Sequence, residues 1–215
     1  MSAGDARMRW RRFRRDRFPD PMVRLLRREL DGLGTVLDVG CGSDSPLQYV
    51  HGVGRKTGVD AFAPSLEASR ARGLHDEYLL MELENLALPA RSYDAVVLLD
   101  LIEHFEKPAG LEFLARLEAL AVKKVLVFTP NGFLPQPPFE NNPWQLHRSG
   151  WTTQEFRGLG YRVEGVLGLK ALRGPMHRPR FWPAPLWERV ANLTRLASAS
   201  RPWLDAGLLA VKDLA

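Results

Sequence analysis

Short apolar runs alternate along this chain with segments of helical periodicity, and that alternation leaves few possible folds. The strand-like runs are residues 35–39, 56–60, 77–83, 93–100 and 123–129. Helical patterns lie near 45–51, 64–72 and 108–120, and an earlier helix is predicted to begin at Pro21. Strands that alternate with helices are typical of βαβ units, in which helices cover both faces of a parallel sheet. We therefore predict an α/β fold.

The length and composition fit one globular domain. The chain has 215 residues, and domains usually have about 100–200. Cys41 is the only cysteine, so no internal disulfide can form and a reducing compartment is expected. No apolar run reaches the ~18 residues of a membrane span, and the arginine-rich start lacks the apolar stretch of a signal peptide. We expect a cytoplasmic protein.

Positive charge is concentrated in the first residues. Residues 1–28 contain ten arginines and three aspartates, a net charge of +7, whereas the whole chain carries +5 and the remainder therefore −2. We expect a basic arm at 1–20 and a single domain at 21–215. Residues 7–18 could contact phosphates, nucleic acid or an anionic surface such as the inner membrane. Alternatively, the arm is solvated and only its aromatic residues dock on the core.

The last third of the chain has a different character. Residues 131–151 are rich in proline and asparagine, which predicts a long loop, and long loops in compact domains are usually functional or disordered. Thr152 and Glu155 have the spacing of a capping box, which predicts a short helix. Two more strands are predicted within 161–172 and 206–214, separated by a Pro- and Trp-rich insertion at 173–205.

The insertion contains one amphipathic helical pattern. Its apolar stripe consists of Leu186, Val190, Leu193 and Ala197. Packing against the core is the interpretation we favour, while a lid, a dimer contact and a membrane-surface helix stay open.

A glycine turn follows the first strand, in the segment TVLDVGCGSDSPLQYV at residues 35–50. Glycines lack Cβ, so a ligand can approach the backbone closely, and we expect the N–H groups of the turn to point outward at the mouth of the sheet. Asp60 ends the second strand, where its carboxylate can accept hydrogen bonds from both hydroxyls of a ribose. A dinucleotide site would have a third glycine at Ser45. Carboxylates at Asp38 and Asp44 favour a ligand with ammonium and sulfonium groups over a pyrophosphate.

Four segments together resemble the successive motifs of class I S-adenosylmethionine-dependent methyltransferases: VLDVGCGSDS, GVD, LENLALPARSYDAVVLLDLIEHFEKP and VLVFTPN. The pairing of LIEH with TPNG resembles the bacterial small-molecule and glycan-pathway members. This resemblance covers about residues 33–170 and implies a Rossmann-like seven-stranded sheet, mostly parallel with an antiparallel last strand. Asp44 departs from the pattern, because many members have a third glycine there.

The resemblance also implies a cofactor pocket for S-adenosylmethionine. The amino-acid end of the cofactor would be held by Asp38, Gly40, Cys41 and Gly42, and the ribose by Asp60. The adenine would contact Ala61, Glu82 and Leu83. Leu99 and Asp100 would flank the reactive methyl group. Glu82 could instead be a surface carboxylate at a strand end.

Methyl transfer from a sulfonium is an in-line displacement, for which orientation and a dry site matter most. A base is needed only for a weakly acidic hydroxyl or a protonated amine, and the candidates are His104, His147 and Asp100. The acceptor would be bound by Asn131, Gln145, His147, Arg148 and Trp151, with Trp144 able to stack on a ring. Each of these side chains could instead be structural.

No metal is expected from the sequence. No pair of histidines has i, i+4 spacing, and Asp100 with Asn131 would give a hard cation only two oxygen ligands.

The sequence therefore predicts an S-adenosylmethionine-dependent methyltransferase (EC 2.1.1.-) that methylates an oxygen of a small-molecule or glycan-type acceptor. The alternatives are a non-catalytic protein with the same fold that acts as a binding module or scaffold, and a methyltransferase of protein or RNA ribose. Methylation of nucleic-acid base amines is disfavoured, because the usual Asn- or Asp-Pro-Pro-aromatic motif does not follow the fourth strand. The oligomeric state is not predicted.

Overall fold

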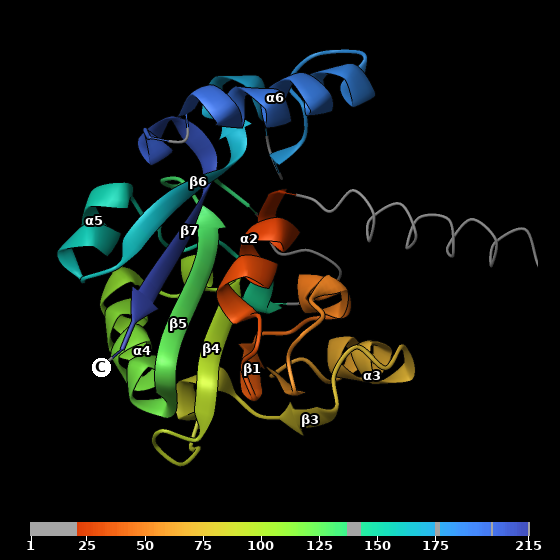
Figure 1. Ribbon diagram of the computed structural model, residues 1–215, viewed down its shortest axis with the longest axis vertical. Coiled ribbons are helices and arrows are strands. Elements are labelled where there is room, and N and C mark those ends of the chain that lie inside the picture. Colours follow the sequence, from red (N-terminus) through yellow and green to blue (C-terminus); the bar gives the residue numbers. More distant parts are fainter. Residues whose placement is uncertain (1–20, 137–142, 175–176, 199, 215) are drawn as a thin grey trace, which may run out of the picture.

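The computed structural model describes residues 21–136, 143–174, 177–198 and 200–214. Within these ranges the chain forms a seven-stranded sheet in the order β3-β2-β1-β4-β5-β7-β6 (Figure 1). The strands are β1 (Thr35–Val39), β2 (Arg55–Asp60), β3 (Glu77–Leu80), β4 (Tyr93–Leu99), β5 (Ala121–Pro130), β6 (Arg162–Leu169) and β7 (Asp205–Asp213). The first five are parallel, and β7 runs antiparallel to both β5 and β6. The predicted Rossmann-like sheet is confirmed.

Helices cover both faces of the sheet, because alternate residues of its central strands are buried on opposite sides. The helices are α2 (Pro21–Leu30), α3 (Ala63–Ala71), α4 (Lys107–Leu120), α5 (Thr153–Gly158) and α6 (Ala184–Ser198). Val96 of β4 packs in one core cluster with Phe113 of α4, whereas its neighbour Val97 packs in the other with Leu26 of α2. In the described part of the chain, no helix is both long and apolar enough to span a bilayer.

The prediction of a helix near 45–51 is wrong about the type and length of the helix. After the glycine turn the chain forms a four-residue 3-10 helix, Pro46–Tyr49. The hydroxyl of Ser45 caps it by accepting a hydrogen bond from the Leu47 N–H at 3.2 Å, and Val50 is already extended. One short turn cannot supply the aligned peptide dipoles with which a helix N-terminus binds a pyrophosphate.

The capping box predicted at α5 is confirmed. The Thr152 hydroxyl accepts a hydrogen bond from the Glu155 N–H at 3.3 Å, and the Glu155 carboxylate accepts one from the Thr152 N–H at 2.8 Å. This reciprocal pair fixes where the long loop ends and the helix begins.

The insertion between β6 and β7 contains α6, which lies beyond the carboxyl end of β5 in Figure 1. The favoured packing of its apolar stripe is wrong for three of the four members, because Leu186 is 54% exposed, Leu193 is 65% exposed and Ala197 is also exposed. The helix instead buries Ala191 against a bulge in β6 at Gly168. The basic arm at 1–20, including residues 7–18, lies outside the described residues.

Candidate active site

A cavity of about 220 Å³ opens where the carboxyl ends of β1, β2 and β4 meet. Parallel strands place the residues that follow them at one edge of the sheet, so Gly40, Asp60 and Asp100 come together although the sequence separates them. Of the residues predicted for the site, those that line this cavity are Gly40, Gly42, Asp60, Ala61, Glu82, Leu83, Asp100, His104, Gln145 and Arg148.

The glycine turn forms one wall of the cavity. Gly40 and Gly42 have φ angles of 70° and 55°, which side chains other than glycine rarely adopt. A Cβ on Gly40 would lie 2.8 Å from the Leu101 side chain, whereas one on Gly42 would meet no atom within 4 Å. Space for a ligand therefore remains beside Gly42.

The N–H groups of this turn do not point outward as predicted. Those of Gly40 and Cys41 donate to the Val59 carbonyl at 2.8 and 3.0 Å, and that of Gly42 donates to Asp60 at 2.8 Å. The turn is thus tied to the end of β2 through its donors. Its carbonyl oxygens suit a cationic ligand better than an anionic one.

Asp60 is held in place by two backbone donors. Its carboxylate oxygens accept hydrogen bonds from the N–H groups of Gly42 and Phe62, each at 2.8 Å. Burial raises the pKa of Asp60, and these two bonds only partly oppose that effect. The carboxylate is therefore a fixed acceptor in the cavity lining.

Three residues predicted to touch the cofactor lie outside the cavity lining. Asp38 is 1% exposed and accepts hydrogen bonds from the Ser45 hydroxyl at 2.5 Å and from His75 Nε2 at 2.8 Å. Cys41 is buried, and Leu99 belongs to a core cluster. Asp38 therefore stabilises the glycine turn without lining the cavity. Its partner is His75, to which the sequence analysis assigned no role.

The charge of the cavity does not come from Asp38 and Asp44, the two carboxylates to which the sequence analysis attributed it. Asp44 pairs with Arg72 at 2.8 Å and accepts from Gln48 at 2.7 Å, away from the lining. Five carboxylates line the cavity against the one guanidinium of Arg148: Asp60, Glu82, Glu84, Asp100 and Glu106. Such a cavity attracts a cation and repels a pyrophosphate.

The fold and a sequence match now agree on the family. A family model described as a methyltransferase domain matches residues 37–118, which run from β1 into α4. Residues 37–118 therefore resemble a methyltransferase domain, and the sheet around them has the fold of the class I S-adenosylmethionine-dependent methyltransferase superfamily. S-adenosylmethionine is the cofactor of this superfamily, and the acidic cavity fits its sulfonium and ammonium groups.

Individual proteins are similar to this chain in sequence or in fold. The mitochondrial ubiquinone biosynthesis O-methyltransferase of Arabidopsis thaliana is 35% identical over 103 residues, which are 45% of this chain and 29% of that protein. A methyltransferase from Archaeoglobus fulgidus superposes with a TM-score of 0.59 at 15% identity, covering 94% of this chain and 98% of the other. Magnesium protoporphyrin IX methyltransferase from Synechocystis PCC 6803, solved with bound S-adenosylmethionine, gives 0.51 at 16% identity, covering 92% and 79%. The two structural likenesses establish the fold alone.

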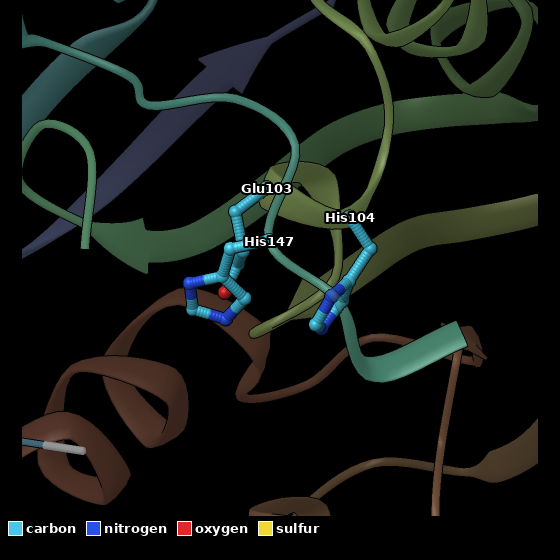
Figure 2. A group of neighbouring side chains, drawn as sticks. All are labelled: Glu103, His104 and His147. Carbon is cyan, nitrogen blue, oxygen red and sulfur yellow. The ribbon is translucent and has the colours of Figure 1, made fainter. Parts of the chain in front are cut away.

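Two of the three candidate bases line the cavity of this methyltransferase domain. Asp100 follows β4 with a φ angle of 52°, and burial raises the pKa of its carboxyl group although water can reach it through the cavity. His104 lies beside it, and burial lowers the pKa of its imidazole, so the ring is neutral near pH 7. His147 is only 8% exposed and lies outside the lining, with its ring centroid 4.9 Å from that of His104 (Figure 2).

Part of the predicted acceptor segment reaches the cavity. Trp144, Gln145 and Arg148 line it. The segment is attached to the 3-10 helix Ile102–His104, because the Glu103 carbonyl accepts from the N–H groups of Arg148 and Ser149 at 2.8 and 3.0 Å. The loop and the end of β4 therefore form one surface.

The predicted acceptor contacts of Asn131 and Trp151 need correction. The Asn131 amide donates to the carbonyls of Trp203 and Asp205 at 2.9 and 2.8 Å, so it joins β5 to the start of β7. Trp151 is 0% exposed and stacks on Phe156 in the core. Neither side chain is available to a ligand.

Several lining residues have no counterpart among the sequence predictions: Ser65, Glu84, Leu101, Phe105, Glu106 and Ala109. Leu101 begins the LIEH motif and Phe105 directly follows it, and their position soon after β4 could have indicated them. Glu84 and Glu106 lie within the long motif segment at residues 83–108, whereas Ser65 and Ala109 lie outside the motif segments.

Proposed function

We propose that this chain is an S-adenosylmethionine-dependent methyltransferase that methylates an oxygen atom of a small-molecule or glycan-type acceptor. The carboxylate-lined cavity, with Asp60 fixed at the end of β2, is the observation that carries the proposal. The name of the Arabidopsis relative, an O-methyltransferase, agrees with an oxygen target. The matched segment spans less than a third of that relative. The relative's own acceptor is therefore not assigned to this chain.

In this proposal, different lining residues contact different parts of the cofactor. Asp60 would accept hydrogen bonds from the ribose hydroxyls, and Ala61, Glu82 and Leu83 would contact the adenine. The carbonyl oxygens of the glycine turn would accept hydrogen bonds from the ammonium group, since the N–H groups are already bonded to the end of β2.

The chemistry follows from the charge of the bound cofactor. The bound cofactor would supply an electrophilic methyl group: the acceptor oxygen would bond to the methyl carbon, and the electron pair of the broken carbon–sulfur bond would stay on sulfur in S-adenosylhomocysteine. The proton of the acceptor hydroxyl passes to Asp100 or to His104, both of which line the cavity. Gln145 and Arg148 would orient the acceptor, and Trp144 would stack against it.

The alternatives are a non-catalytic binding or scaffold protein of the same fold and a methyltransferase of protein or RNA ribose. Two possible bases in the cavity favour catalysis over a scaffold role. We place the protein in a bacterial cytoplasm as part of the same proposal.

Calorimetric titration with S-adenosylhomocysteine tests the function first. We expect the native chain to bind, and Asp60→Ala to bind roughly tenfold more weakly or worse, because each lost hydrogen bond to a charged group costs about 1.5–3 kcal/mol. Asp44→Asn is the matched control, since Asp44 pairs with Arg72 outside the cavity, and its affinity should stay within roughly twofold of native. A folded native chain that does not bind would sink the proposal.

We also propose that residues 7–18 contact an anionic membrane surface together with apolar residues of the insertion. Trp182, Leu193 and Leu196 are 86%, 65% and 80% exposed, and a chain that has both exposed apolar groups and a basic segment suits a lipid interface. The chain should sediment with phosphatidylglycerol vesicles but much less with neutral ones. Deletion of 1–20 or the double change Leu193→Ser and Leu196→Ser should each reduce this binding. Equal sedimentation with both vesicle types, or none with either, would count against the contact.

A further inference from the structure

Three side chains gather where the end of β4 meets the loop before α5, and one of them, His104, lines the cavity. They are Glu103, His104 and His147 (Figure 2), and each offers one ligand atom that lies within 4.8 Å of the other two. Glu103 and His104 come from the 3-10 helix Ile102–His104, and His147 comes from the loop attached to it by the Glu103 carbonyl. Backbone hydrogen bonds therefore hold the two halves of the cluster together.

Glu103 has a buried oxygen without a hydrogen-bond partner. Its side chain is 2% exposed, and one carboxylate oxygen accepts from the Thr129 hydroxyl at 2.9 Å. The other, Oε1, has no hydrogen-bond partner within the described part of the chain. An orphaned buried carboxylate oxygen is costly, and a bound cation would compensate it.

The two histidines are oriented as metal-binding histidines usually are. His104 Nδ1 lies 3.1 Å from the Leu146 carbonyl, and His147 Nδ1 lies 2.6 Å from the Leu134 carbonyl. A carbonyl can only accept, so each Nδ1 carries the proton and leaves a lone pair on Nε2 of the neutral ring. Burial lowers the pKa of both imidazoles, which keeps them neutral.

We propose that Glu103, His104 and His147 form a binding site for a divalent transition-metal ion. Three atoms within 4.8 Å of one another lie at most roughly 2.8 Å (4.8/√3) from a common centre, and zinc bonds to such ligands measure about 2.0–2.2 Å, so movements below ~1 Å complete the site. Two imidazoles and one carboxylate suit zinc, iron(II) or cobalt(II), whereas magnesium prefers oxygen ligands.

The site adds a chemical role that rests on the proposed methyltransferase function. His104 lines the cavity, so open coordination positions of the ion would face the acceptor. A hydroxyl oxygen bound to the ion would lose its proton more easily and become a nucleophile at neutral pH. His104 would then act as a ligand, and Asp100 would accept the proton.

Metal binding can be measured without turnover. Bound metal is first removed from the untagged full-length chain with a chelator. The chain is then titrated with Zn²⁺ by calorimetry and with Co²⁺ by visible absorption. A titration with S-adenosylhomocysteine follows. Glu103→Gln and His147→Gln are the test variants, and the first keeps an acceptor for Thr129. His51→Gln is the control, because His51 is exposed and lies outside the cluster.

We expect the native chain to bind one equivalent of metal. The affinity for metal should be at least tenfold lower in both test variants and within twofold of native in the control. Circular dichroism establishes that each variant is folded, and if one is not, the other decides. No saturable binding to the native chain, native-like binding in both test variants, or equal loss in His51→Gln would overturn the site. S-adenosylhomocysteine binding without metal binding refutes only the metal site, whereas metal binding without S-adenosylhomocysteine binding refutes only the proposed function.

Discussion

At the scale of single residues, the environment of Asp60 predicts how cofactor affinity depends on pH. Burial raises the pKa of Asp60, and Asp38 adds a smaller contribution in the same direction. A ribose hydroxyl donates to the ionised carboxylate, so binding weakens as the pH falls through this raised value. The Kd for S-adenosylhomocysteine should therefore begin to rise at a higher pH than it would with an ordinary aspartate as the acid range is approached from about pH 7.

The matched variant for this prediction is Asp60→Asn, which keeps the shape but cannot ionise. Its affinity should be lower at neutral pH and should change less with pH than that of the native chain. A native Kd that is constant over this range, measured by calorimetry, would contradict the prediction. Equal pH dependence in both proteins would assign the effect to Glu82, Glu84 or another lining carboxylate.

The sequence predicted residues whose roles depend on local backbone geometry. Gly40, Gly42 and Asp60 were found because glycines after a strand and an acid after the next strand have a regular spacing. The choice of a cationic ligand was also right, although Asp44 does not carry the charge. The bond between Asp38 and His75 joins residues 37 positions apart, and Trp151 is buried by tertiary packing. No local pattern encodes such contacts.

At the scale of elements, Gly168 determines how α6 joins the sheet. It lies in the bulge of β6 with a φ angle of 71°, and the α6 backbone at Ala191 occupies the place of its Cβ. Gly168→Ala should therefore lower the free energy of unfolding by about 2 kcal/mol or more, through left-handed strain and displacement of the helix. Urea unfolding measures this loss.

Gly158→Ala is the control for this prediction. A Cβ on Gly158 would meet no atom within 4 Å, and its φ is not positive, so the change should be neutral or stabilise α5 by up to about 1 kcal/mol. If Gly168→Ala were as stable as native, the bulge would not hold α6 in the described position.

The elements were predicted with uneven success, for physical reasons. Buried parallel strands such as β1 and β4 are continuous apolar runs, which a sequence shows directly. The 3-10 helix after the glycine turn depends on the bond between Ser45 and Asp38, and the periodicity of its residues did not reveal it. For α6 the periodicity predicted a helix, but tertiary contacts decided which face is buried.

At the scale of the whole molecule, one buried carboxylate connects α2 to β5 and to β6, the strand at one edge of the sheet. Glu29 of α2 is 5% exposed and pairs with Arg28 at 2.8 Å, with Lys124 of β5 at 3.0 Å and with Arg162 of β6. Burial alone would raise the pKa of Glu29, but hydrogen bonds from Arg162, Arg28 and Lys124 outweigh it and lower the pKa to about 2. The first described helix and the last strands are thus held by one charged cluster.

Glu29→Gln should lower the free energy of unfolding by about 1–3 kcal/mol at neutral pH, the lower part of the range allowing for solvent around the arginines. The folded-state pKa lies below the unfolded value of about 4.3, so this stabilisation is complete above pH ~5 and is lost as the pH falls toward ~2. Urea unfolding at several pH values should show the native and variant curves converging over that window. Glu67→Gln, at an exposed pair with Arg70, should cost less than about 0.5 kcal/mol throughout. A loss in Glu29→Gln that stays constant from pH ~5 to ~2 would show that the cluster stabilises the fold by packing and not by charge.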